Sequence, residues 1–300
     1  MRVGFTVYSN RADEIVPICQ RAEALGFEGA WVGDHVVSPE NQSTDHPYET
    51  RVPMVLSGDE RIYDHFTMIG AMLAGTSRLK VASGIYLLPL RHPLLTARAC
   101  LTAHKMSGGR FRFGVGLGWL PDEFAALGVP FKDRAKRFEE ILDVLPKLFA
   151  GAGPVSSDGP LYPFAPLQLT SEPAAIPLLF GGTAAPAVRR AALRGDGWYG
   201  TTIPLEECLK IREDILQIRR EQALDHKPFE FVCRVVGPAT RDNIERYGTV
   251  GFDHVVLPWE SIHPSGQADM SLGAKLNSLS RVAKELGLSQ VGVGESIPPR

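Results

Sequence analysis

The chain alternates, almost from end to end, between short runs rich in β-branched and aromatic residues and longer segments with helical periodicity. The short runs predict eight strands, at residues 3–7, 27–32, 79–83, 111–115, 176–180, 197–200, 229–236 and 254–257. Strands that alternate with helices pair in parallel, and eight such units in 300 residues are typical of a (β/α)8 TIM barrel. An open doubly wound sheet is the alternative. We favour the barrel because the alternation continues without a break in composition.

Two segments are longer than ordinary connecting loops. Residues 36–64 follow the second predicted strand, and residues 151–175, which contain five prolines, precede the fifth. Long ordered loops often form lids or the walls of binding sites. The sequence therefore predicts a single barrel domain over residues 1–290 with these two insertions, followed by a C-terminal tail over residues 291–300.

Composition excludes several classes of protein. With 32 basic and 34 acidic residues the net charge is −2, so we expect no basic surface for nucleic acid or for an anionic membrane. No apolar run is long enough for a signal peptide or a membrane span. The four cysteines form no CxxC pair. We expect a cytoplasmic protein with buried, reduced thiols and no structural zinc.

In a TIM barrel the active site is built at the C-terminal ends of the strands, and here those ends are rich in glycine and poor in metal ligands. Asp34 and His35 follow the second predicted strand and are the titratable pair expected at the mouth. A histidine in this position can exchange a proton near neutral pH, although a histidine bonded to its own loop is the alternative. Only this pair and Glu260 could bind a metal, so we predict no catalytic metal.

A second candidate site lies after the fifth predicted strand. Gly181, Gly182 and Thr183 precede a helix expected at residues 186–194. Backbone N–H groups at a helix N-terminus, with a hydroxyl beside them, can bind phosphate, although a tight strand–helix turn also requires glycine. The glycines of residues 114–118 lack the spacing of a dinucleotide fingerprint and its later acidic residue, so a Rossmann interpretation is rejected.

One stretch carries a specific resemblance. Residues 107–148, SGGRFRFGVGLGWLPDEFAALGVPFKDRAKRFEEILDVLPKL, resemble the signature of the bacterial luciferase-like superfamily, and the resemblance extends over most of residues 1–260. The GDHVVSP sequence at residues 33–39, the long insertion after it, and GVGLGW followed by DEF are most similar to the branch that uses coenzyme F420, a 5-deazaflavin. Residues 151–175 depart from the family pattern.

This resemblance implies a cofactor ring lying across the strand ends and hydride transfer at the deazaflavin C5. It implies that Asp34 and His35 lie beside the reactive carbon and that His35 handles the proton. Ser83 and Gly84 match a pair joined by a non-proline cis peptide bond, and Ile85 belongs to the same contact with the ring. The remaining implied cofactor contacts are the loop of Gly116, Leu117, Gly118 and Trp119 and the phosphate-binding Gly181, Gly182 and Thr183.

Two alternatives stay open. FMN with a monooxygenase reaction is the first, since both cofactors share the ring, the ribityl chain and the phosphate. The acidic tail of F420 favours basic residues outside the mouth, for which Arg51, Arg61 and Arg91 are candidates. A barrel that only binds a flavin or a phosphorylated ligand is the second alternative.

The remaining expectations concern partners and the pocket wall. We expect a small-molecule substrate enclosed by Tyr48, Tyr63 and Trp119, and the family resemblance implies a homodimer. Three other histidines, His65, His92 and His104, lie in or at the start of predicted helices and are expected to be partly buried surface residues.

Overall fold

The computed structural model describes residues 1–40, 43, 61–252 and 254–288 of the chain. Within them, eight parallel strands close into a barrel, because β3 pairs with β5 and β11 pairs with β1. The TIM-barrel prediction is therefore confirmed. In order around the barrel, the strands are β1 (Arg2–Thr6), β2 (Gly29–Val32), β3 (Lys80–Ser83), β5 (Phe111–Gly116), β8 (Leu178–Gly181), β9 (Gly197–Gly200), β10 (Glu230–Arg234) and β11 (His254–Leu257).

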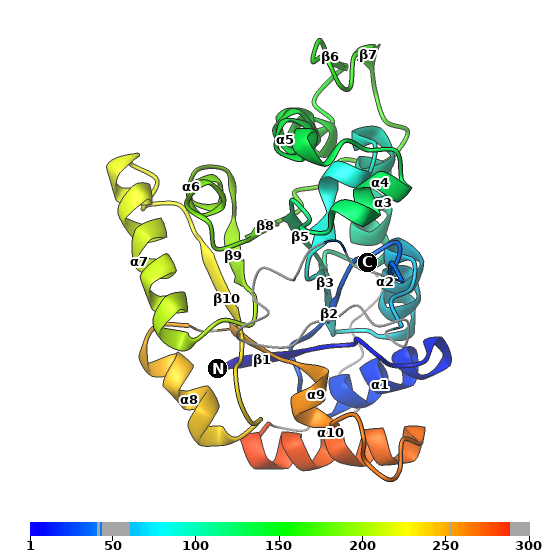
Figure 1. Cartoon of the computed structure of the whole chain (residues 1–300), viewed down its shortest axis with the longest axis vertical. Coiled ribbons are helices and arrows are strands. Elements are labelled where there is room, and N and C mark those ends of the chain that lie inside the picture. Colours follow the sequence, from blue (N-terminus) through cyan, green and yellow to red (C-terminus); the bar gives the residue numbers. More distant parts are fainter. Residues whose placement is uncertain (41–42, 44–60, 253, 289–300) are drawn as a thin grey trace.

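Helices surround this barrel on the outside (Figure 1). Each long helix presents an apolar face to the strands, as the helical periodicity requires. The helices are α1 (Ala12–Ala24), α2 (His65–Gly75), α3 (Pro93–Met106), α5 (Arg134–Ala150), α6 (Ala185–Arg194), α7 (Leu205–Glu221), α8 (Arg241–Thr249) and α10 (Leu272–Leu286). Of the described residues, none forms a helix long and apolar enough to cross a membrane. All four cysteines are buried and free.

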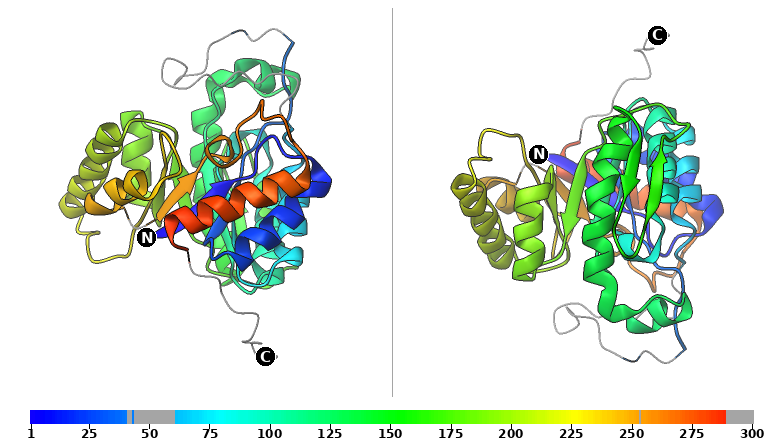
Figure 2. Two further views of the ribbon diagram at one scale, coloured as in Figure 1. Left: turned by 90° about the horizontal axis from the view of Figure 1, so that it is seen from below. Right: turned by 90° about the horizontal axis from the view of Figure 1, so that it is seen from above.

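The structure adds elements that the sequence pattern did not predict. Short helices follow the ends of two strands, namely α4 (Pro121–Ala126) after β5 and α9 (Trp259–Ile262) after β11, with the turns η1 (Leu88–Leu90) and η2 (Phe131–Asp133). A two-residue strand, β4 (Tyr86–Leu87), also pairs with β5. The segment expected to be a long loop before the fifth strand contains an antiparallel hairpin, β6 (Val155–Ser157) and β7 (Phe164–Leu167), which lies beside α5 (Figure 2).

Some expectations fall on residues that the structure does not describe. Most of the insertion after β2 does so, including Tyr48 and Arg51, and so does the predicted tail. The last helix begins at Leu272, because the Ser271 hydroxyl accepts the Ala274 N–H and caps the helix there.

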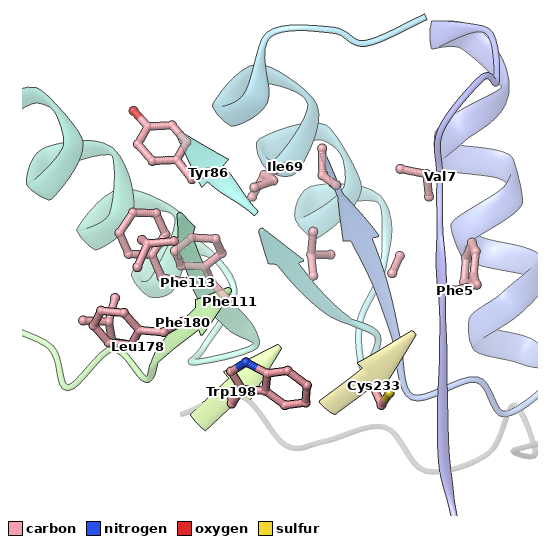
Figure 3. Close-up of a cluster of buried hydrophobic side chains, with 14 of the residues drawn as sticks. Phe5, Val7, Ile69, Tyr86, Phe111, Phe113, Leu178, Phe180, Trp198 and Cys233 are labelled. Carbon is pink, nitrogen blue, oxygen red and sulfur yellow. The ribbon is translucent and has the colours of Figure 1, made fainter. Parts of the chain in front are cut away.

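Side chains on the two faces of the strands enter two different cores. The outward faces pack against the helices, and Figure 3 shows this packing around Phe111, Phe113 and Phe180. The inward faces form a small cluster that fills the barrel, in which the rings of Trp31 and Tyr199 stack with centroids 4.6 Å apart. Because side chains alternate along a strand, these residues fill the inside of the barrel while their neighbours face the helices.

A buried ion pair fastens the last helix to the first. Lys275 Nζ of α10 lies 2.5 Å from Glu14 Oε2 of α1, and the two side chains are 4% and 8% exposed. The same carboxylate oxygen accepts the N–H of Arg11. Removing one partner of a buried pair leaves the other charge desolvated and uncompensated.

We therefore expect Lys275→Ala to lower the free energy of unfolding by about 3 kcal/mol, because Glu14 would be left buried without its cation. Urea denaturation followed by circular dichroism measures this. Lys284→Ala, at an exposed position of the same helix, is the control and should change the free energy by no more than about 0.5 kcal/mol. Equal effects of the two substitutions would contradict a structural role for the pair.

Candidate functional site

A cavity of about 690 Å³ opens at the C-terminal ends of the barrel strands. Its lining includes nearly all of the residues singled out from the sequence: Asp34, His35, Gly84, Ile85, Gly116, Leu117, Gly118, Trp119, Gly181, Gly182 and Thr183. The exception is Ser83, which is buried beneath the cavity. Tyr63, expected in the wall, packs on the core instead, and its neighbour Ile62 lines the cavity.

His35 is held by a carboxylate that the sequence analysis did not identify. Glu123, in the first turn of α4, has a fully buried side chain. One of its oxygens lies 3.1 Å from His35 Nδ1, and the other accepts the N–H of Val36 at 2.5 Å. A carboxylate accepts only, so His35 carries its proton on Nδ1. Nε2 is then the ring nitrogen that is left to meet a molecule in the cavity.

The carboxylate of Asp34 is bonded to residues of the segment after β3. Its oxygens lie 2.6 and 2.7 Å from the two terminal nitrogens of Arg91, and one of them also accepts the Leu87 N–H at 2.8 Å. This bidentate pair is largely buried, which favours a positioning role for Asp34. Arg91, a candidate for the cofactor tail, is bound to Asp34, whereas Arg61 is exposed.

His65 is buried in the barrel wall, so the expectation of a surface histidine was wrong. Its Nδ1 lies 3.1 Å from the Gly33 carbonyl oxygen and its Nε2 lies 2.7 Å from Ser83 Oγ. Burial lowers the pKa of His65. The neutral ring therefore donates from Nδ1 to Gly33 and accepts the Ser83 hydroxyl proton. These bonds join the residue before Asp34 to the residue before Gly84, and they give Ser83 a structural role.

The floor of the cavity is formed by Gly84 and Ile85. The cis peptide bond joins these two residues, not Ser83 and Gly84 as the resemblance implied. Ser83 is the last residue of β3 and is bonded to His65, so the chain leaves the strand after Ser83 and the cis bond follows Gly84. Tyr8 donates its hydroxyl proton to the Gly84 carbonyl at 2.7 Å.

Two glycines make room for the side chain of Ile85. A Cβ atom at Gly116 would lie 2.1 Å from Ile85 Cδ1, and one at Gly181 would lie 2.6 Å from the same atom. Both distances are far inside van der Waals contact, so any larger residue would displace Ile85. The glycines at these strand ends thus shape the floor.

Gly182 has a backbone conformation that favours glycine. Its φ is +105°, and a Cβ atom there would lie 2.9 Å from the Cβ of Ala187. Its carbonyl accepts the Trp198 Nε1–H at 3.0 Å. The helix that follows, α6, begins without a side-chain cap. In its first turn Pro186 has no N–H and the Ala187 N–H donates to the Ala184 carbonyl at 2.8 Å, so the Ala185 N–H is the first-turn donor that remains for an anionic ligand.

Two arginines line the same cavity as this turn. The central guanidinium carbon of Arg134 lies 3.8 Å from the centroid of the Phe131 ring, and the buried Nε of Arg134 has no hydrogen-bond partner. Arg190 is paired with Glu139 at 2.6 Å. Cationic side chains next to a helix N-terminus strengthen an anion site. The sequence analysis missed both arginines because they lie inside helical segments and reach the cavity only in the folded chain.

Among the described residues, no three His, Cys, Asp or Glu side chains are grouped so that they could hold a metal ion. The polar groups at the cavity include a histidine–carboxylate pair, a backbone turn for an anion, and arginines. This set can bind an anionic cofactor and exchange one proton with a ligand.

Comparison with known proteins gives a consistent result. A family model described as luciferase-like monooxygenase matches residues 2–248. An uncharacterized protein of Mycobacterium tuberculosis is 27% identical over 272 residues, covering 90% of this chain and 93% of that protein.

Two solved structures share the fold at low sequence identity. An F420-dependent secondary alcohol dehydrogenase in complex with an F420–acetone adduct has a TM-score of 0.75 at 16% identity, covering 95% of this chain and 98% of that chain. The second structure is the oxygenating constituent of 3,6-diketocamphane monooxygenase from Pseudomonas putida, in complex with FMN. It has a TM-score of 0.62 at 17% identity, covering 82% of this chain and 70% of that chain.

The buried His65 generates a prediction about pH. Since its pKa is lowered in the folded chain and is about 6.5 when unfolded, the unfolded state binds more protons as the pH falls below about 6.5. The free energy of unfolding should therefore fall below that pH, by at most about 1.4 kcal/mol per pH unit for this one group. Urea denaturation between pH 7 and 5 measures it.

His65→Gln is expected to remove part of this slope, because glutamine does not titrate. His226→Gln, at an exposed histidine, is the matched control and should leave the slope unchanged. A slope that is the same in the wild type and in His65→Gln would show that His65 does not contribute to acid sensitivity.

Proposed function

The chain belongs to the family of luciferase-like monooxygenases, and from this membership we propose that it is an F420-dependent oxidoreductase, which transfers a hydride between the deazaflavin C5 and a small organic substrate. The observation that carries the proposal is the His35–Glu123 pair, which borders the same cavity as the glycine turn at Gly182. One cavity thus combines a group for proton exchange with a site for an anionic cofactor.

The residues present fit a cofactor made of a ring, a ribityl chain and a phosphate. The volume of about 690 Å³ is in the range of cofactor and ligand pockets. The turn at Gly182, the N-terminus of α6 and Arg134 would hold the phosphate. Gly84 and Ile85 would lie under the ring, with Trp119 beside it.

When bound, the deazaflavin supplies a carbon that accepts or donates two electrons as a hydride. The chain supplies the proton exchange: Nε2 of His35 takes the proton of a substrate hydroxyl, or returns it in the reverse direction. Glu123 stabilises the imidazolium formed at that moment and keeps the ring oriented. The apolar side chains of Leu117 and Trp119 exclude water from the reacting groups.

FMN with an oxygenating reaction is the second candidate. The family description and the FMN complex of the Pseudomonas putida enzyme support it, and the same phosphate site would serve both cofactors. The GDHVVSP and GVGLGW…DEF sequences and the fold shared with an F420-dependent alcohol dehydrogenase support F420.

Titration of the purified protein with F420 and with FMN tests the proposal. We expect F420 to bind at least tenfold more tightly, a difference of about 1.4 kcal/mol. Isothermal titration calorimetry measures both constants. Equal affinities, or tighter binding of FMN, would favour the second candidate, and the absence of binding by either cofactor would refute the function.

Gly182→Asp locates the phosphate in the same titration. The carboxylate would meet the phosphate where backbone donors should lie, so affinity should fall at least about tenfold. Gly108→Asp is a matched control, because Gly108 also has positive φ and lies outside the cavity. It should bind normally.

His35→Ala tests the proton exchange. We expect turnover to fall by roughly 10²–10⁴-fold, as for loss of a general acid–base group, while cofactor affinity changes little. A screen of secondary alcohols and ketones against the cofactor-loaded enzyme supplies the assay. The pH-dependent limb of the wild-type rate should be absent from the variant.

Glu123→Gln separates positioning from chemistry. Glutamine has one acceptor oxygen, so it cannot serve both His35 Nδ1–H and the Val36 N–H. Turnover should fall by about tenfold with the pH-dependent limb retained.

If His35→Ala keeps nearly full turnover and the same pH profile, His35 is only part of the pocket wall.

A further inference from the structure

The cavity wall has a polar side and an apolar side, and the reaction above does not use the polar side. The polar side comes from β9 and β10, with the hydroxyls of Tyr199 and Thr202 and the guanidinium of Arg234. Each of these three side chains has a buried polar atom without a hydrogen-bond partner. The apolar side comes from β4 and the chain after β5, with Leu87, Leu117 and Trp119.

Arg234 is the charged member of the polar side. It ends β10 and lies over the ring of Tyr8, with its central carbon 5.6 Å from the ring centroid. Its Nε is buried and unpartnered. Nowhere in the described part of the chain does a carboxylate form an ion pair with it. A partly buried cation without an anion is costly, so the arrangement suits a ligand that brings negative charge.

Tyr199 is placed to donate to the same ligand. Its hydroxyl is within the electrostatic reach of Arg234 and Tyr8, and it lies 3.2 Å from where a Cβ atom of Gly84 would be. Burial raises the pKa of this hydroxyl, so it remains protonated and can donate. Tyr199 therefore presents a donor next to Gly84, and Arg234 lines the same cavity.

The order of strands relates these two sides to the phosphate site. Around the barrel the apolar side, at β4 and β5, comes first, then the turn at Gly182 after β8, then the polar side at β9 and β10. In both candidate cofactors the chain that carries the phosphate leaves the central ring. That ring lies between a benzenoid half and a pyrimidine half, which carries two carbonyl groups. With the phosphate held after β8, one half of the ring would meet the apolar side of the cavity and the other half would meet the polar side.

We infer that Arg234 and Tyr199 bind the pyrimidine half of the cofactor ring and stabilise the negative charge that this half acquires on reduction. The inference rests on the function proposed above, and it holds for F420 and FMN alike because they share this half. The benzenoid half then meets Leu87, Leu117 and Trp119. The side of the central ring opposite the chain, with C5 in F420 or N5 in FMN, would then face the ends of β1 and β2, and His35 follows β2.

The charge follows from the electron balance. Oxidation of a secondary alcohol breaks its C–H bond, and the hydride carries two electrons to the ring. The hydroxyl proton goes to His35, and the substrate leaves as a ketone. The ring gains a hydrogen and one negative charge, which is shared between N1 and the C2 carbonyl oxygen. A cation beside these atoms favours the reduced form over the oxidised form.

Spectroelectrochemical titration of the bound cofactor tests this without an activity assay. Arg234→Gln should weaken binding of the reduced form about tenfold more than binding of the oxidised form. This difference corresponds to a midpoint potential about 30 mV more negative for a two-electron couple. Arg234→Lys keeps the charge and should recover at least half of the shift. Tyr199→Phe should move the potential in the same direction by a smaller amount.

Arg134→Gln is the matched control. Arg134 lines the cavity one helical turn before Phe138, whose ring contacts Phe180 of β8, the strand that leads into the turn at Gly182. The charge of a phosphate held there would not change on reduction. This variant should therefore weaken both redox forms equally and leave the potential unchanged. A shift as large as that of Arg234→Gln would overturn the assignment of the two sides.

Other outcomes are equally decisive. An unchanged potential in Arg234→Gln, with the oxidised cofactor still bound, would refute the inference and leave the proposed function intact. If Arg234→Gln binds neither redox form, the midpoint potential of Tyr199→Phe tests the inference instead, because this change removes only one oxygen from a buried ring. A shift to a more negative potential supports the inference, and an unchanged potential refutes it. If the wild type binds neither F420 nor FMN, both proposals fail together.

Discussion

The buried carboxylate of Glu123 is the interaction on which the candidate site depends. Its two oxygens are used at the same time, one by the Val36 N–H and one by His35 Nδ1. The first bond holds the start of the long insertion against α4, and the second fixes the tautomer of the histidine. A buried carboxylate with both oxygens bonded is stable only while both donors stay in place. The loop and the histidine are therefore positioned together.

The same principle operates on the other side of His35. Asp34 binds Arg91 and the Leu87 N–H, and His65 bridges the Gly33 carbonyl and Ser83. Each of these contacts joins the end of β2 to the chain around β3 and β4. The floor at Gly84 and the proton-exchanging group at His35 thus share one hydrogen-bonded framework, and displacement of either requires breaking several buried bonds.

The barrel could be predicted because its signal is repeated along the chain. Each strand–helix unit is a local pattern, and parallel pairing follows from the alternation. The strand ends were placed to within a residue or two, so His35 and the glycines of the cavity floor were found. Glu123 and Arg134 were not, because they lie in helical turns, and no local pattern says that these turns fold over the cavity.

Arg234 shows a different kind of miss. The predicted strand at residues 229–236 continued past the true end of β10, which is Arg234. Val232 belongs to the cluster inside the barrel, and the two-residue period places position 234 on the same face, at the mouth. A predicted strand that ended at residue 234 would place the arginine at the mouth of the barrel. The cis bond has a different origin: the strand prediction ends correctly at Ser83, and the bond's position comes from the family resemblance, which places it one residue too early.

Closure of the barrel gives each strand end a separate task in the proposed site. The pairing order places β8 between the apolar walls of β4 and β5 and the donors of β9 and β10, and it places β2 across from β9. An anion held after β8 therefore has an apolar surface on one side, a cation on the other, and His35 opposite. None of these relations depends on neighbouring positions in the chain, because the residues involved are separated by tens to hundreds of positions. The hydrogen-bond ladder that closes the sheet brings them around one cavity, so the chemistry of the site is a consequence of strand order.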